Sequence, residues 1–182
     1  MGTLKEEDGF SKILAAFRSY KILRDKCVLV IAGYFDPHVL DNLAHPDDFL
    51  VNSCQGFMIN FGFVDSAILP TLVDLCDGVL LLRDESYGAK TSFPTRLPFF
   101  LQKNRVAITS SVGDIPLYLR AGVDYIDCNP ITIENILKSL FLFANMNKTE
   151  RLSMSTSAFE RSSQVFDPEY QAGRLLEYLL YH

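Results

Sequence analysis

The stretch 83–96 gathers most of the groups in this sequence that could bind an anion. It reads RDESYGAKTSFPTR, so it is polar and carries three cations. Pro94 is typical of the first position of a helix, and Ser92 could cap that helix. Thr95 and Arg96 would then lie in its first turn, where free amides, the positive helix end, a hydroxyl and a guanidinium together suit a diphosphate. The alternative is a capped helix whose arginine faces solvent.

A second loop, 110–116, contains a Gly-Asp pair at Gly113 and Asp114. Glycine after a strand lets the backbone approach a ligand closely, and Asp114 could cap the helix that follows. An ordinary strand-to-helix turn would use the same residues. Each loop alone therefore indicates where a ligand could bind, not which ligand.

Motifs of several other protein classes are absent. The sequence has no GxGxxG fingerprint, no GxxxxGK[ST] loop and no GxSxG elbow, which argues against dinucleotide, P-loop and α/β-hydrolase sites. No metal site is predicted, because the histidines are isolated from one another and from every cysteine: His38, His45 and His182. The cysteines form no CxxC pair, which favours reduced thiols and a cytoplasmic protein: Cys27, Cys54, Cys76 and Cys128.

The composition fits one folded domain over residues 1–182. With 48% hydrophobic and 12% aromatic side chains, a chain of this length can build a core, and disorder is excluded. Seventeen Lys and Arg against 22 Asp and Glu give a net charge of −5, which argues against a nucleic-acid partner. No apolar run is long enough to cross a bilayer, and no signal peptide is visible.

Strand-sized apolar runs alternate with helical patterns along the chain. The predicted strands are 27–33, 57–61, 78–82, 105–109 and 123–127. The predicted helices are 10–20 (capped by Asp8), 39–43, 66–76, one starting at Pro94, 116–120, 132–146, 149–165 and 168–181. This alternation predicts an α/β fold, a parallel sheet with helices on both faces. Ligands then bind at the carboxyl ends of the strands, in the loops after Ala32, Phe61, Leu82, Thr109 and Asp127.

The order of these segments resembles a known family. The segments are 2–17, with GTL, DGF and LAAF; 29–33, LVIAG; 59–64, INFGFV; 93–97, FPTRL; and 109–119, with VGDI and YL. Together they are similar, nearly end to end, to the donor-binding C-terminal half of group 1 glycosyltransferases (family 4, GT-B fold). The resemblance implies a Rossmann-like, doubly wound parallel sheet.

The same resemblance implies sugar transfer from a nucleotide-diphosphate sugar, with retention and without a cofactor or metal. The catalytic roles would fall on Glu85 and Arg96. Donor binding would use the backbone of Gly62, Phe63 and Val64 for the base, Ser86, Tyr87 and Gly88 near the sugar, Pro94, Thr95 and Arg96 for the diphosphate, and also Gly113 and Asp114. A glycan or lipid-linked acceptor, as in polysaccharide biosynthesis, would bind through a missing N-terminal domain. Peripheral membrane association of the full-length enzyme is compatible with the family.

The sequence departs from this family at several positions. Thr3 stands where the family usually has an arginine, Glu7 or Asp8 where it has a lysine, and Phe99 in place of a glutamate that binds ribose. A carboxylate facing a diphosphate is repulsive. The family's first strand precedes the glycine matched by Gly2, so that strand is largely missing, which predicts a gap inside the sheet. We expect a fragment of a longer enzyme that is inactive alone.

Two alternatives stay open on the sequence. A non-catalytic partner domain would keep the fold, lose the donor site and bind a second protein instead of nucleotide sugars. A phospho-receiver domain would place acidic residues at strand ends, where Asp84 and Asp127 lie, although the length and the closing helices fit that class poorly.

Overall fold

The computed structural model describes residues 3–4, 8–35 and 54–181. The helix predicted at 39–43 lies outside these residues, and of Thr3 only the backbone is described. Several residues singled out in the sequence also lie outside the described part: Gly2, Glu7, His38, His45 and His182.

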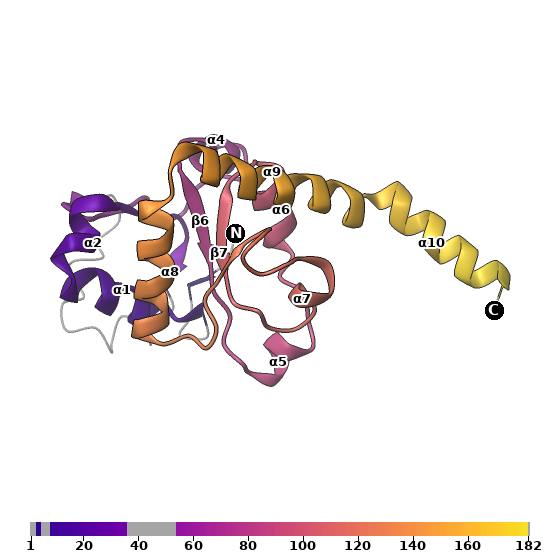
Figure 1. The fold of residues 1–182 in the computed structure, drawn as a ribbon, viewed down its shortest axis with the longest axis horizontal. Helices are drawn as coiled ribbons and strands as arrows, with labels where there is room; N and C mark the ends of the chain where they lie inside the picture. The colour runs from indigo at the N-terminus through magenta and orange to yellow at the C-terminus, as the bar shows by residue number, and fades with distance from the viewer. Residues whose placement is uncertain (1–2, 5–7, 36–53, 182) are drawn as a thin grey trace.

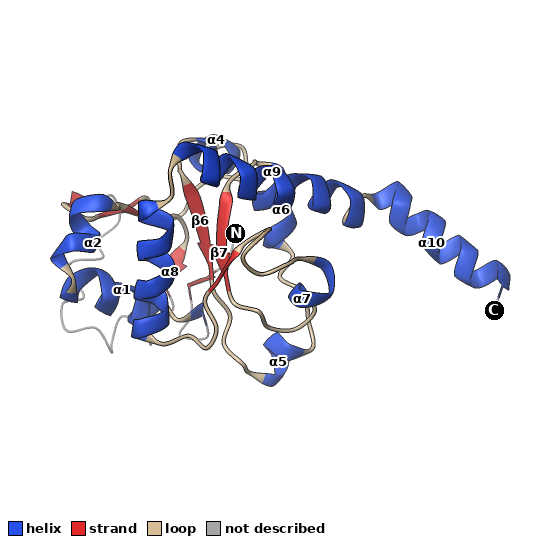
Figure 2. Ribbon diagram, viewed as in Figure 1, coloured by secondary structure: helices blue, strands red, loops and turns tan. Residues whose placement is uncertain are grey.

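Three parallel strands form one sheet at the centre of the molecule (Figure 2). They are β6 (Gly78–Leu81), β7 (Val106–Thr109) and β8 (Ile126–Asp127), in that order across the sheet. β7 pairs with both neighbours, and all four of its residues are buried. Alternate β7 side chains face opposite sides, so this sheet is packed on both faces.

A second sheet lies on the N-terminal side of the fold. In it β2 (Leu29–Ile31) runs parallel to β5 (Met58–Asn60), and the short β4 (Cys54–Gln55) pairs antiparallel with β5. β1 (Thr3–Leu4) pairs in parallel with β3 (Tyr34–Phe35). Each of the five predicted strands contains one observed strand, whereas β1, β3 and the antiparallel β4 were not predicted.

No strand among the described residues joins β2 to β6, and the two sheets are separate. The family resemblance predicted a gap between the strand at 27–33 and the strand at 78–82. The observed break falls at that place, so the predicted gap in the sheet is confirmed for the described residues.

Helices cover both faces of the strands, as predicted. α1 (Phe10–Ser19), α2 (Lys21–Lys26) and α8 (Ile133–Asn145) pack together over a core that includes Val106 and Ile108 of β7. On the other face, Ala107 of β7 packs with residues of three helices: α6 (Arg96–Gln102), α7 (Ile115–Tyr118) and α9 (Lys148–Val165). α4 (Leu69–Asp74) precedes β6.

The chain ends in α10 (Pro168–Tyr181), which projects from the end of α9 (Figure 1). None of its residues is buried. The sequence predicted this helix with the right bounds but as one that closes the fold, which is wrong because its apolar side chains meet little of the domain. No helix among the described residues is both long enough and apolar enough to span a membrane.

The start of α1 also differs from prediction. Its N-cap is Gly9, with φ 66°, and not Asp8. A Cβ at Gly9 would lie 2.5 Å from the side chain of Ile131, so close packing and left-handed backbone both require glycine there. Packing against the loop before α8 therefore helps to fix the position of this helix end.

Candidate functional site

The carboxyl ends of β6, β7 and β8 lie at one edge of their parallel sheet, and hydrogen bonds join the loops that follow. Ser110, fully buried, accepts a bond from the backbone N–H of Arg83 (2.8 Å) and donates to the Arg83 carbonyl (2.6 Å). The Ser111 N–H donates to the Asp127 carboxylate (2.9 Å). We call the connected loops 82–96, 110–115 and 128–132 the carboxyl rim.

Arg83, the first cation of the loop 82–96, is used to hold that loop in shape. Its guanidinium donates to Ser92 Oγ (2.9 Å), and Ser92 Oγ donates to the Gly88 carbonyl (2.5 Å). Ser92 therefore does not cap the next helix as predicted, because its hydroxyl both accepts and donates a hydrogen bond within the loop.

The next helix, α6, begins at Arg96, and the prediction that it starts at Pro94 is wrong. Thr95 is the N-cap residue and makes no side-chain capping bond. Pro94 is buried, and its carbonyl accepts the N–H of Leu97 (2.9 Å). Arg96 is exposed and has no hydrogen bond or ion pair with any described residue. Its guanidinium is thus available to an anion at the carboxyl rim.

The Glu85 carboxylate lies between two polar groups from different segments. Its Oε2 is 3.2 Å from Lys90 Nζ, and its Oε1 accepts a long hydrogen bond from Asn129 Nδ2 (3.4 Å). Asn129 Oδ1 is buried without a partner among the described residues. Sequence reasoning did not identify Asn129; its place two residues after the end of β8 was the one available signal.

Ser86, Tyr87 and Gly88 form the start of α5 (Tyr87–Lys90), a short helix that was not predicted. Ser86 is the N-cap, and its Oγ accepts the Ala89 N–H (3.4 Å). Tyr87 is 84% exposed, and a side chain at Gly88 would meet no atom within 4 Å. These residues therefore lie on the solvent side of the carboxyl rim.

Gly113 brings the loop after β7 close to the backbone of the loop 82–96. Its φ is 63°, and a Cβ there would collide with the carbonyl oxygens of Ala89 and Ser92. Asp114 is the N-cap residue of α7, but its side chain makes no capping hydrogen bond, so the capping contact predicted for it is absent.

The segment predicted to meet a nucleotide base follows β5 in the other sheet. Gly62 has φ 60°; its N–H donates to buried Asn60 Oδ1 (2.9 Å), and its carbonyl accepts the Gly33 N–H (2.7 Å). Phe63 is exposed and stacks with Tyr34, with ring centroids 5.4 Å apart, whereas Val64 is buried. Asn60 and Tyr34 were not identified from the sequence.

The residues that suggested a phospho-receiver or a partner domain make contacts within the protein. The Asp84 carboxylate accepts the Ser86 N–H (3.0 Å), and Asp127 accepts the Ser111 N–H, so both carboxylates hold turns. Phe99, on α6, contacts Phe100, with ring centroids 5.5 Å apart and the rings tilted by 57°. It offers no hydrogen-bond acceptor.

Burial suppresses ionisation of the neutral groups next to the carboxyl rim. Desolvation raises the pKa of Tyr125, whose hydroxyl lies 2.7 Å from Ser111 Oγ. Desolvation likewise raises the pKa of the buried Cys128 thiol. The thiols of Cys27 and Cys76 are free and half-buried, and desolvation by burial raises their pKa as well. No group of His, Cys, Asp and Glu among the described residues could hold a metal ion.

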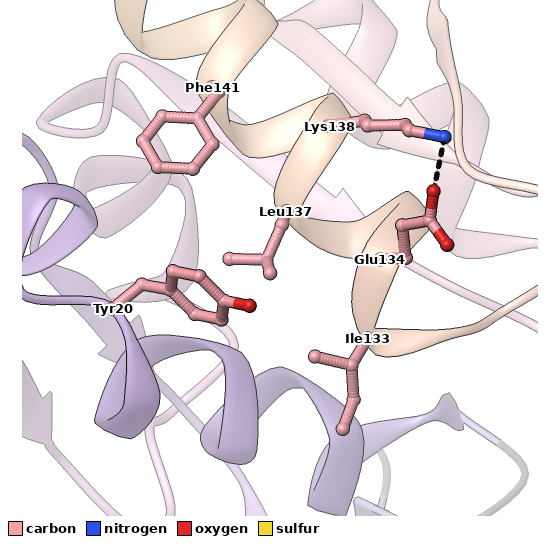
Figure 3. Close-up of a pocket in the computed structure, with 6 residues that line it drawn as sticks. All are labelled: Tyr20, Ile133, Glu134, Leu137, Lys138 and Phe141. Carbon is pink, nitrogen blue, oxygen red and sulfur yellow. Dashed lines mark ion pairs between the residues drawn. The ribbon is translucent and has the colours of Figure 1, made fainter.

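A cavity of about 690 Å³ lies between the α1–α2 junction and α8 (Figure 3). Tyr20, Leu137 and Phe141 line it, and Glu134 and Lys138 form an ion pair beside it (2.7 Å). A second cavity of about 360 Å³ is lined by residues around Arg120 and α9. None of the predicted site residues lines either cavity, so the candidate site is an open edge of the domain.

Comparison with sequences identified no match: no protein-family model matches the chain, and no curated protein matches it. Comparison with solved structures did identify similar proteins. Anabaena HepE, crystallised with UDP-glucose, aligns over 100% of this chain and 48% of its own length, with TM-score 0.73 and 14% identity. The chain thus spans about half of HepE.

Two further solved structures are similar. The C-terminal domain of LpcC, a group 1 family glycosyl transferase of Francisella tularensis, aligns over 92% of this chain and 84% of its own, with TM-score 0.69 and 13% identity. The pneumococcal O-GlcNAc transferase GtfA, in complex with UDP and GlcNAc, aligns over 99% of this chain and 35% of its own, with TM-score 0.65 and 14% identity. These alignments confirm the predicted Rossmann-like GT-B fold.

Proposed function

Starting from a chain with the fold of a glycosyltransferase C-terminal domain, we propose that it binds a nucleotide-diphosphate sugar at the carboxyl rim. The observation that carries the proposal is Arg96: a cation that is exposed, unpaired among the described residues and placed at the turn before α6. Arg83 and Lys90 are engaged with Ser92 and Glu85, which leaves Arg96 as the cation of this loop free to bind a diphosphate.

The chemistry proposed for this edge is retaining transfer of a sugar, as in group 1 (family 4) enzymes. A leaving diphosphate develops negative charge, and a guanidinium aimed at it stabilises that charge. Pro94 and Thr95 supply backbone at the same turn. Glu85, with Ser86, Tyr87 and Gly88 beside it, faces the sugar, and the unpartnered Asn129 Oδ1 offers an acceptor for one of its hydroxyls.

The base is proposed to lie on the other sheet, against the backbone of Gly62, Phe63 and Val64. Asn60 holds this turn in place before any ligand arrives. Gly113 and Asp114 support the carboxyl rim from the loop after β7. The acceptor, a glycan or lipid-linked sugar, would bind a second domain, so we expect the chain alone to bind donor but not to transfer sugar.

Titration calorimetry with UDP-, GDP- and ADP-sugars tests the proposal directly. Loss of one charge-assisted contact removes about 1.5–3 kcal/mol, so Arg96→Ala should weaken binding about 10- to 100-fold. Arg174→Ala, on the projecting α10, is the matched control and should leave the affinity unchanged. Binding that ignores Arg96, or no binding to any donor, contradicts the proposal.

Phe99 favours one competing function. Where a donor site would use a carboxylate for ribose, this chain has a ring packed on Phe100. A non-catalytic partner domain would show no affinity for any of the three nucleotide sugars and a stable complex with a second protein. Phe99→Glu should strengthen nucleotide-sugar binding if the donor site works, and should change nothing in a partner domain.

A further inference from the structure

The second cavity of the domain, about 360 Å³ in volume, is lined by two arginines. Arg120 lies in the segment that leads into β8, and Arg161 comes from α9 together with the other lining residues, Ser157, Glu160 and Gln164. No loop of the carboxyl rim contributes a lining residue. We call this cavity the two-arginine pocket, and it is separate from the proposed donor site.

The Arg120 guanidinium is held by one edge. Its Nε donates to Asp124 Oδ2 (3.0 Å), and its Nη2 donates to Asp124 Oδ1 (3.0 Å) and to Ser157 Oγ (3.1 Å). The Asp124 side chain is fully buried, whereas that of Arg120 is 64% exposed. A guanidinium has N–H donors on all three nitrogens, so those on Nη1 have no partner among the described residues. Arg120 is therefore fixed in place with donors still available.

Arg161 is half-buried and is also held through its Nε. This atom donates to the Tyr118 carbonyl (2.8 Å), and Arg161 forms no ion pair or other hydrogen bond with a described residue. The N–H donors of its Nη1 and Nη2 are thus unused. A cation that is partly removed from water without an opposite charge is costly. An anion therefore gains more by binding there than at a fully exposed arginine.

Two polar side chains of α9 complete the lining. Glu160 and Gln164 are exposed, and neither forms an ion pair or a hydrogen bond with a described residue. The Asp124 carboxylate is engaged by Arg120 and Ser157, so Glu160 is the lining residue that opposes an anion. Its carboxylate repels a bare anion but accepts hydrogen bonds from hydroxyl groups. The pocket therefore suits a ligand that carries both an anionic group and hydroxyls.

The free donors of the two arginines indicate which anion fits. A carboxylate has two oxygens, and one guanidinium fork engages both of them. A phosphate monoester has three terminal oxygens and so matches two arginines better. The cavity volume of about 360 Å³ lies within the range of small-ligand sites, roughly 300–1,000 Å³, which leaves room for an organic group beside the phosphate.

We propose that the two-arginine pocket binds the phosphate monoester of a small hydroxylated molecule, of the sugar monophosphate class. Arg161 binds two phosphate oxygens with its Nη1 and Nη2, and Arg120 Nη1 donates to the third. Glu160 and Gln164 bind hydroxyl groups of the organic part. This site does not depend on donor binding at the carboxyl rim.

Titration calorimetry with three matched probes tests the ligand class. Glucose 6-phosphate should bind, and its affinity should fall as salt is added, because salt screens charges that are partly exposed. Glucuronate, which has a carboxylate at the same carbon, should bind at least about 10-fold more weakly, since it lacks one charge-assisted contact. Glucose should not bind. Equal affinity for glucuronate and glucose 6-phosphate, or no binding of glucose 6-phosphate, overturns the proposal.

Two neighbouring glutamate substitutions on α9 test the position of the site. Gln164→Glu adds a negative charge to the lining and should weaken glucose 6-phosphate binding about 5-fold or more. Ser163→Glu is the matched control, because Ser163 is also exposed but does not line the pocket, and it should leave the affinity unchanged. Equal effects of the two substitutions contradict the assignment of the phosphate to this pocket.

The arginines distinguish this site from the carboxyl rim. Arg161→Ala should weaken glucose 6-phosphate binding about 10-fold or more and leave the affinity for nucleotide sugars unchanged. Arg96→Ala should do the reverse, so failure of the donor-binding proposal and failure of this one are distinguishable. Loss of glucose 6-phosphate binding on Arg96→Ala but not on Arg161→Ala would place the phosphate at the carboxyl rim and overturn the proposal.

Discussion

The two three-stranded sheets of this domain have similar strands but very different surroundings. β7 lies between two parallel partners and between two core clusters, while β2 has one partner, and its buried Ile31 lies in a small third cluster. The carboxyl rim, which carries the proposed phosphate-binding turn, belongs to the enclosed sheet. The difference teaches that the proposed phosphate-binding turn is positioned by the more fully enclosed sheet.

Matched isoleucines give the sharpest test of that contrast. Ile108 on β7 is 3% exposed and Ile31 on β2 is 4% exposed, so burial alone would predict equal effects. Large-to-small core changes cost about 2–5 kcal/mol, least where the surroundings can collapse. We expect Ile108→Ala near the top of that range and Ile31→Ala near the bottom, measured by urea denaturation.

The comparison fails if Ile31→Ala costs as much as Ile108→Ala. Should either alanine variant fail to fold, the Ile→Val pair gives the same ranking at about 0.5–1.5 kcal/mol.

Gly113 tests how tightly the carboxyl rim is packed. Gly113→Ala needs a left-handed backbone, at about 1–2 kcal/mol, and pushes a Cβ into two backbone carbonyl oxygens. Gly122→Ala is the control, because its φ is 77° but its Cβ would meet no atom within 4 Å. We expect Gly113→Ala to lower the melting temperature about twice as far as Gly122→Ala and to weaken donor binding as well. Equal losses of melting temperature in the two variants would show that the carboxyl rim can rearrange around a Cβ at position 113.

The strands were predictable because buried parallel strands are continuous apolar runs, as at 78–82 and 105–109. The edge at which ligands would gather followed from the same alternation of strands and helices. The break in the sheet followed from the family resemblance, and the separate β2 and β6 edges confirm it. Each of these features depends on local pattern or on order along the chain.

The errors come from contacts between distant residues. Ser92 fits a cap by type, but Arg83, nine residues away, engages its hydroxyl. At Gly113 the sequence could not show that the carbonyls of Ala89 and Ser92 lie against this glycine. The partners of Asn129, 44 residues from Glu85 in the sequence, are invisible to spacing or periodicity.

Asp124 tests the polar support of the enclosed sheet through pH. Its side chain is fully buried next to β8; burial raises its pKa, but bonds from Arg120 (2.8 and 3.0 Å) and Ser157 (2.6 Å) outweigh this, so its pKa lies below the ordinary value. A lowered pKa stabilises the fold above about pH 4 and loses that contribution as pH falls through the folded pKa.

Asp124→Asn should therefore flatten the loss of stability below about pH 4, followed by urea midpoints from pH 7 to pH 2. Glu134→Gln is the control, because Glu134 pairs with Lys138 at an exposed surface, where ion pairs contribute little. If stability falls with pH in the same way in both variants, the buried Asp124–Arg120 ion pair contributes no more to stability than the exposed pair of Glu134 and Lys138.

The smallest effect is expected on α10, which contrasts with both sheets. Leu176 is 60% exposed, so replacing it removes little buried surface. Surface changes of this kind lie within about 0.5 kcal/mol, and Leu176→Ser should leave the urea midpoint unchanged, whereas Leu101→Ser, at a position with 0% exposure on α6, should not. Sedimentation of the same variants completes the test. A clear loss of stability on Leu176→Ser, dependent on protein concentration, would mean that α10 is covered by another molecule in solution and that the enclosed sheet is not the sole source of the domain's stability.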